Sequence, residues 1–149
     1  MILPASIDKG SLMSRLKVLI AEDESINRKL LHASLTKWGC DVVSTANGQD
    51  ACEALQQGGI DLCILDWEMP KMTGPEVCQW LRSSDLGQSY VILLTTKDQP
   101  EDIEAGYEAG ADDYMVKPFK GDELHSRVSY LARATPIAGC SAIWGQMTA

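Results

Sequence analysis

Short apolar runs recur along the chain, and their spacing limits the folds that it can adopt more than any other feature. Four of the runs are nearly continuous rather than alternating, as in strands that are buried on both faces. They cover residues 16–20, 61–65, 90–94 and 113–116, and a fifth, weaker run covers residues 41–46. We therefore expect five strands.

Segments with apolar side chains at helical spacing separate these runs. The expected helices cover residues 25–38, 48–57, 74–83, 99–109 and 120–133. In the first of them, Ile26, Leu30, Leu31, Leu35 and Trp38 share one face. Strands that alternate with helices form a parallel sheet with helices on both faces. The sequence therefore predicts a doubly wound α/β domain of five βα units.

The length of the chain suggests a single folded domain. Its 149 residues, with a hydrophobic content of 45%, are enough to bury a core. We expect residues 1–14 to be a loose leader and residues 15–134 to be the domain. Residues 135–149 carry no charge, and we expect an interdomain linker or a segment that packs against a partner.

The composition argues against several classes of protein. With 13 basic against 21 acidic residues, the net charge is -8, which does not favour direct binding of nucleic acid. We see neither an apolar stretch long enough to span a membrane nor a signal peptide, so we expect a cytoplasmic protein. The five cysteines show no CxxC spacing and are expected to be buried thiols: Cys40, Cys52, Cys63, Cys78 and Cys140.

Polar residues follow each of the four strong strands. Glu22, Asp23 and Glu24 follow the first, and Asp66 ends the run at 61–65. Thr95 and Thr96 follow the run at 90–94, and Lys117 follows the run at 113–116. Ligands of open α/β sheets bind at the carboxyl ends of the strands, so we expect these residues to converge in one crevice.

The chemistry of this set points to phosphoryl transfer. Clustered carboxylates raise one another's pKa, and a Mg²⁺ ion relieves their repulsion. A carboxylate nucleophile, a metal, a lysine and a hydroxyl together suit transfer of a phosphoryl group to Asp66. Taken singly, each residue has an ordinary structural explanation, such as a turn for Asp66 or a helix N-terminus for the acids.

Four motifs in this order resemble the receiver domain of two-component response regulators. They are LIAEDE (19–24), LDWEMPKMTG (65–74), LLTT (93–96) and AGADDYMVKPF (109–119). The resemblance covers about residues 16–133. It implies a flavodoxin-like fold with the strand order 2-1-3-4-5.

The resemblance also implies a role for each site residue. Asp66 would accept a phosphoryl group from a sensor histidine kinase or a phosphotransfer protein. Glu22, Asp23, Asp66 and the backbone carbonyl of Glu68 would bind Mg²⁺. Lys117 would contact the phosphoryl group, with a cis peptide bond to Pro118.

Thr95 would turn towards the phosphoryl group, and Tyr114 would rotate inward into the space that Thr95 leaves. Residues 98–133 would then signal to an output domain or a downstream protein. The resemblance does not decide whether the domain forms a homodimer on activation, because the chain matches only part of the charged dimer surface of winged-helix regulators. The chain has Glu108, Asp113 and Arg127 but Ile103 where a basic residue is expected.

Three further residues are candidates for tuning the phosphoryl lifetime. Glu68 and Lys97 flank the site, and we hypothesise that they form an ion pair that slows hydrolysis. The alternative is that both are solvated, because surface ion pairs contribute little. Thr96 stands where the family favours a small residue, and it would narrow access for the phosphoryl donor.

Two other functions are weighed against this signalling switch. A haloacid dehalogenase-type phosphatase also uses an aspartate nucleophile, threonine, lysine and Mg²⁺. Such an enzyme requires a second aspartate as general acid two residues after the nucleophile, where this chain has Glu68. A receiver that serves only as a protein-binding module is the other, although such forms lose site residues that this chain keeps. We therefore expect a domain that catalyses only its own phosphorylation and dephosphorylation.

Overall fold

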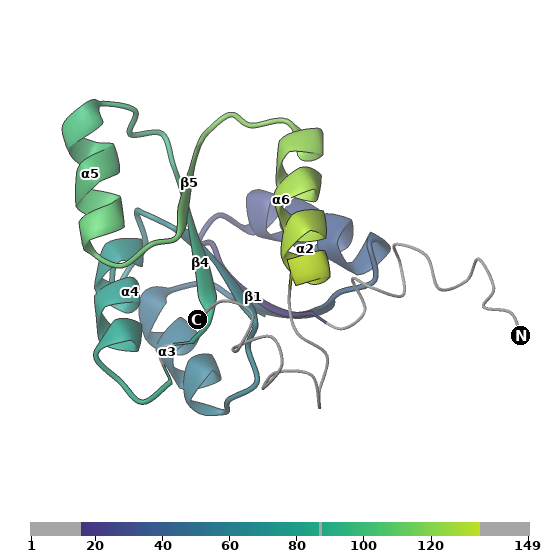
Figure 1. The fold of residues 1–149 in the computed structure, drawn as a ribbon, viewed down its shortest axis with the longest axis horizontal. Coiled ribbons are helices and arrows are strands. Elements are labelled where there is room, and N and C mark those ends of the chain that lie inside the picture. Colours follow the sequence, from purple (N-terminus) through teal and green to yellow (C-terminus); the bar gives the residue numbers. More distant parts are fainter. Residues whose placement is uncertain (1–15, 87, 135–149) are drawn as a thin grey trace, which may run out of the picture.

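We describe the fold from a computed structural model, which describes residues 16–86 and 88–134. The expected leader and tail, and Cys140 with them, lie outside the described residues. Strands and helices alternate through the described part of the chain (Figure 1). Their bounds are β1 (Lys17–Ala21), α2 (Ser25–Lys37), β2 (Asp41–Thr45), α3 (Gly48–Gln56), β3 (Leu62–Asp66), α4 (Gly74–Arg82), β4 (Tyr90–Thr95), α5 (Pro100–Glu108), β5 (Asp113–Val116) and α6 (Gly121–Ala134).

The strands form one parallel sheet in the order β2-β1-β3-β4-β5, which confirms the expected fold. Helices α3, α4 and α5 cover one face, and α2 and α6 cover the other (Figure 1). In the central strand β3, Cys63 and Leu65 pack against the helices α3, α4 and α5, and Leu62 and Ile64 pack against α2 and α6. Both faces of β3 are therefore apolar, which explains why its sequence does not alternate.

The start of α4 fixes the loop that follows β3. Thr73 and Glu76 form a capping box, in which the Glu76 N–H donates to the Thr73 hydroxyl and the Thr73 N–H donates to the Glu76 carboxylate. The N–H of Gly74 donates to the carbonyl of Trp67 at 2.9 Å. A Cβ at position 74 would lie 2.5 Å from the carbonyl oxygen of Asp66, so only glycine lets α4 begin so close to the end of β3.

The apolar face of α2 is buried only in part. Leu31 and Leu35 of α2 are buried, but Ile26 and Leu30 on the same expected face are 66% and 62% exposed. Helical spacing predicts which side chains share a face, but another element must cover that face to bury it. Here the sheet covers only part of the face.

The cysteines of the described residues are buried, as the sequence predicts. The cysteines within the described residues, Cys40, Cys52, Cys63 and Cys78, are buried free thiols. None of the helices in the described ranges combines the length and the apolar character that crossing a bilayer requires.

Candidate functional site

Two buried carboxylates meet at the carboxyl edge of the sheet. Asp66 is the last residue of β3, and Glu22 directly follows β1, the neighbouring strand. Glu22 is 1% exposed and Asp66 is 7% exposed. Asp23 comes next, and carboxylate oxygens of these three residues lie within 4.8 Å of one another. Oxygen ligands that converge in this way fit a hard cation such as Mg²⁺.

Lys117 supplies the positive charge of the site. Its Nζ donates to Glu22 Oε1 at 2.9 Å and to Asp66 Oδ1 at 3.2 Å. Strand β4 lies between β3 and β5, so the long side chain of Lys117 reaches across it to the two carboxylates. The peptide bond to Pro118 is cis, as expected.

The carboxylates and the lysine perturb one another. The pKa of Asp66 is raised from 3.8 to about 6, first by burial and then by the negative charge of Glu22, while Lys117 opposes the shift. Burial by itself lowers the pKa of Lys117, but the hydrogen bond to Glu22 and the charges of both carboxylates outweigh it and raise that pKa. The ionised form of Asp66 is therefore destabilised, and added positive charge would relieve it.

These residues line a cavity of about 350 Å³ at the edge of the sheet. The lining residues are Glu22, Asp23, Glu24, Asn27, Asp66, Glu68, Thr95, Thr96 and Lys117. The structure therefore brings together most of the residues that sequence reasoning singled out. Lys97 and Tyr114 are not among the lining residues.

Thr95 and Tyr114 both form hydrogen bonds with the backbone of Lys97. The N–H of Lys97 donates to Thr95 Oγ1 at 3.0 Å, and the Tyr114 hydroxyl donates to the Lys97 carbonyl at 2.8 Å. Tyr114 is buried, and its ring lies against Gly106 of α5, where a Cβ would be 3.0 Å from two ring atoms. The tyrosine expected to rotate inward therefore lies inward in this structure.

Lys97 and Glu68 do not form the hypothesised ion pair. Among residues 16–86 and 88–134, the ion pairs include none between these two side chains. The Nζ of Lys97 instead lies 5.7 Å from the centroid of the Trp67 ring. Glu68 is exposed and lines the acidic cavity.

A comparison with protein families accounts for this arrangement. The family model described as "Response regulator receiver domain" matches residues 18–129, a segment that includes Glu22, Asp66 and Lys117. The chain belongs to this family. It is a receiver domain of two-component signalling, and the phosphatase alternative is set aside.

Curated relatives of this receiver domain are transcriptional regulators. The PhoP regulator of alkaline phosphatase synthesis from Bacillus subtilis is 38% identical over 84% of this chain and 52% of its own length. The AfsQ1 regulator of Streptomyces coelicolor is 39% identical over 78% of this chain and 51% of its own length. The chain thus spans about half the length of the curated relatives it matches.

Solved structures of receiver domains have the same fold. The receiver domain of the Francisella response regulator 1452 aligns with a TM-score of 0.75 and 30% identity, covering 79% of this chain and 97% of that chain. The receiver domain of the sensor kinase PA1611 from Pseudomonas aeruginosa, with a magnesium ion in its active-site cleft, aligns with a TM-score of 0.72 and 27% identity, covering 78% of this chain and 97% of that chain.

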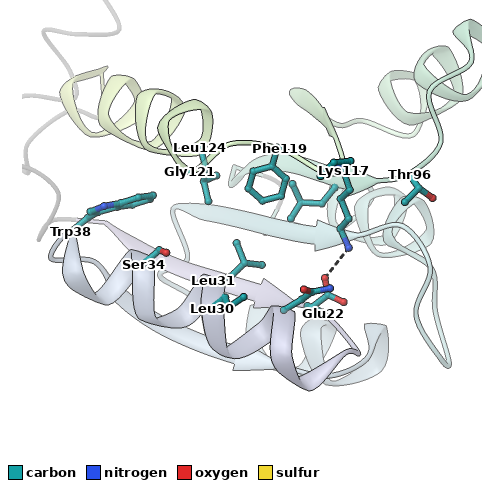
Figure 2. A pocket seen from close by; sticks show the side chains of 13 residues that line it. Glu22, Leu30, Leu31, Ser34, Trp38, Thr96, Lys117, Phe119, Gly121 and Leu124 are labelled. Carbon is teal, nitrogen blue, oxygen red and sulfur yellow. Dashed lines mark hydrogen bonds and ion pairs between the residues drawn. The ribbon is translucent and has the colours of Figure 1, made fainter.

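An apolar groove of about 580 Å³ adjoins the acidic cavity of this receiver domain. It lies between α2 and the segment that leads into α6, with Trp38 at one end and the Lys117–Glu22 pair at the other (Figure 2). Its lining includes the apolar residues Leu30, Leu31, Trp38, Leu94, Phe119 and Leu124. Glu22, Asn27, Thr96 and Lys117 line both hollows, so the groove opens into the acidic cavity.

Sequence reasoning missed two polar residues of α2 that belong to this site. Asn27 lines both hollows. Arg28 donates from Nη1 to the carbonyl of Glu22 at 2.9 Å and to that of Asp23 at 3.3 Å, which fixes the acidic loop. Their place one helical turn after the acids is the only sequence signal for them, and such polar residues are common in exposed helices.

Proposed function

We propose that Asp66 accepts a phosphoryl group from a phosphohistidine of a sensor histidine kinase or a phosphotransfer protein. A carboxylate oxygen of Asp66 forms the new bond to phosphorus, and the bond between phosphorus and the imidazole nitrogen breaks. The electron pair of that bond stays on the imidazole. The observation that carries the proposal is the position of Asp66, which is buried at a strand end with its Oδ1 3.2 Å from Lys117 Nζ.

The neighbouring residues orient and neutralise the incoming group. Glu22, Asp23, Asp66 and the backbone carbonyl of Glu68 would hold Mg²⁺, and the bound ion would supply positive charge beside the phosphoryl oxygens. The ammonium of Lys117 shares its donors between Asp66 and Glu22, and it contacts the phosphoryl oxygens once Asp66 is modified.

Phosphorylation then changes the hydrogen bonds of Thr95. Its hydroxyl releases the N–H of Lys97 and turns to the phosphoryl group, while Tyr114 stays inward. The surface formed by α5, β5 and α6 carries this change to an output domain or a downstream protein. Because the relatives are transcriptional regulators and this chain spans about half of their length, we propose transcriptional control as the output, without direct contact between this domain and nucleic acid.

The apolar groove gives the phosphoryl donor a place to dock. It opens directly into the acidic cavity, and the exposed Leu30 lies on its rim with Ile26 nearby on the same helix. We assign it to the phosphohistidine-bearing domain of the partner, whose apolar side chains would cover these residues. The chain acts in the cytoplasm with this partner, and it catalyses only its own phosphorylation and dephosphorylation.

The test is phosphorylation by a small acyl phosphate. Wild type is incubated with Mg²⁺ and acetyl phosphate and then weighed intact by mass spectrometry, beside Asp66→Asn and the exposed control Asp85→Asn. We expect one phosphoryl adduct on wild type and on the control and none on Asp66→Asn. Steady release of phosphate without an adduct, or an adduct that persists in Asp66→Asn, would contradict the proposal.

A further inference from the structure

Lys97 is held at three points, which together connect the switch residues with the acceptor strand. Its N–H donates to Thr95 Oγ1 at 3.0 Å, and its carbonyl accepts from the Tyr114 hydroxyl at 2.8 Å. Its ammonium lies 5.7 Å from the ring centroid of Trp67, within the usual range of a cation–π contact. Trp67, the partner in this third contact, has no role of its own in the phosphoryl site described above.

The position of Trp67 is fixed by its backbone hydrogen bonds and by its contact with Tyr114. It directly follows Asp66, its N–H donates to the carbonyl of Leu94 at 2.9 Å, and its carbonyl accepts from the N–H of Gly74 at 2.9 Å. The rings of Trp67 and Tyr114 meet edge to face with their centroids 6.2 Å apart. The indole is thus fixed on the acceptor loop by its backbone, and it contacts both the tyrosine and the lysine.

The contact that the structure gives the ammonium of Lys97 is with Trp67, which does not line the acidic cavity. Lys97 is not among the residues that line the acidic cavity, whereas its neighbour Thr96 is. The described residues also show no ion pair between Lys97 and Glu68. The contact with Trp67 is therefore the route through which we expect this ammonium to affect phosphorylation.

We propose that Lys97 is a positioning residue whose contact with Trp67 keeps the carbonyl of residue 97 in place for the Tyr114 hydroxyl. The inference rests on the function proposed above. When Thr95 turns to the phosphoryl group, the loop loses its bond between Thr95 and the Lys97 N–H. The contact with Trp67 and the bond from Tyr114 then hold the loop, so the inward position of Tyr114 persists in the phosphorylated state.

Removal of the ammonium has a measurable consequence. The phosphoryl group and the inward position of Tyr114 stabilise the same state of the domain. A substitution that destabilises the inward tyrosine therefore also lowers the affinity for a phosphoryl group or its analogue. A cation–π contact at a partly exposed site corresponds to a change of about two- to fivefold in an equilibrium constant. We expect Lys97→Met to lower the affinity for beryllofluoride, a phosphoryl analogue that binds with Mg²⁺, by about this factor.

Two backgrounds separate this role from a general effect of charge. Lys97→Met is made in wild type, in Trp67→Leu and in Tyr114→Phe, and beryllofluoride affinity is measured by calorimetry. We expect the loss of affinity only in the wild-type background, and Lys97→Arg should restore it because the guanidinium also lies well on an indole ring. An equal loss in all three backgrounds would show that the charge acts directly on the anion, which overturns the inference.

A second measurement tests the contact without any phosphoryl analogue. The free energy of unfolding is determined for the same variants in EDTA, and Lys97→Met should destabilise wild type more than it destabilises Trp67→Leu. Equal destabilisation in both backgrounds would show that the contact contributes nothing. A wild type that binds no beryllofluoride would refute the proposed function, whereas equal binding by wild type and Lys97→Met would refute this inference alone.

Discussion

In the absence of a divalent cation, Asp66→Asn should make the protein more stable, although it removes the proposed acceptor. The side chain of Asp66 is only 10% exposed and stands beside Glu22, and its pKa is raised from 3.8 to about 6. Asparagine has nearly the same shape and can still accept from Lys117. It carries no charge, so its burial does not oppose folding in the same way.

The direction in which stability changes with pH follows from proton binding at Asp66. Between pH 3.8 and about 6 the folded state binds more protons at Asp66 than the unfolded state does, so wild type loses stability as pH rises through this window. The rise of the Asp66 pKa from 3.8 to about 6 corresponds to about 3 kcal/mol in the free energy of unfolding. About 2 kcal/mol of this stability is lost between about pH 4.5 and pH 8. We expect the stability of Asp66→Asn, relative to wild type, to increase by up to this amount over that range.

The assay is urea unfolding in EDTA at several pH values, with Asp85→Asn as an exposed control. Other carboxylates titrate in both proteins, so the difference between wild type and variant isolates position 66. Excess Mg²⁺ should stabilise wild type and reduce the advantage of the variant, because the ion binds the folded carboxylate cluster. If the difference does not change with pH, or becomes smaller as pH rises, Asp66 is not destabilised by its surroundings and the reasoning fails.

Three other outcomes follow from the packing. Gly74→Ala places a Cβ 2.5 Å from the carbonyl oxygen of Asp66, so unfolding should become easier by about 2 kcal/mol or more, whereas unchanged stability would mean that α4 can shift without cost. Gly106→Ala brings a Cβ to 3.0 Å from the Tyr114 ring and should displace it outward, seen as greater exposure of that tyrosine by NMR; an unmoved ring would contradict this. Leu30→Lys should slow phosphoryl transfer from a phosphohistidine protein shown to phosphorylate wild type, while the rate with acetyl phosphate stays the same. Equal slowing with both donors would argue against docking in the groove.

Much of the site followed from the sequence because it depends on where the strands end. The apolar run of β3 ends at Asp66, and the run of β1 is followed by Glu22 and Asp23. In a parallel sheet such ends share one edge, so the convergence of these residues with Lys117 was predictable without any coordinates.

The sequence by itself determined the order of the elements, the doubly wound sheet and the residues at its carboxyl edge, since apolar periodicity and strand ends are local properties. Only the tertiary structure decided that Leu30 is exposed, that Arg28 fixes the acidic loop and that Lys97 lies on Trp67 and not beside Glu68. A long side chain has several rotamers of similar energy. Neighbours far away in the sequence select among them, and those neighbours are in place only once the chain has folded.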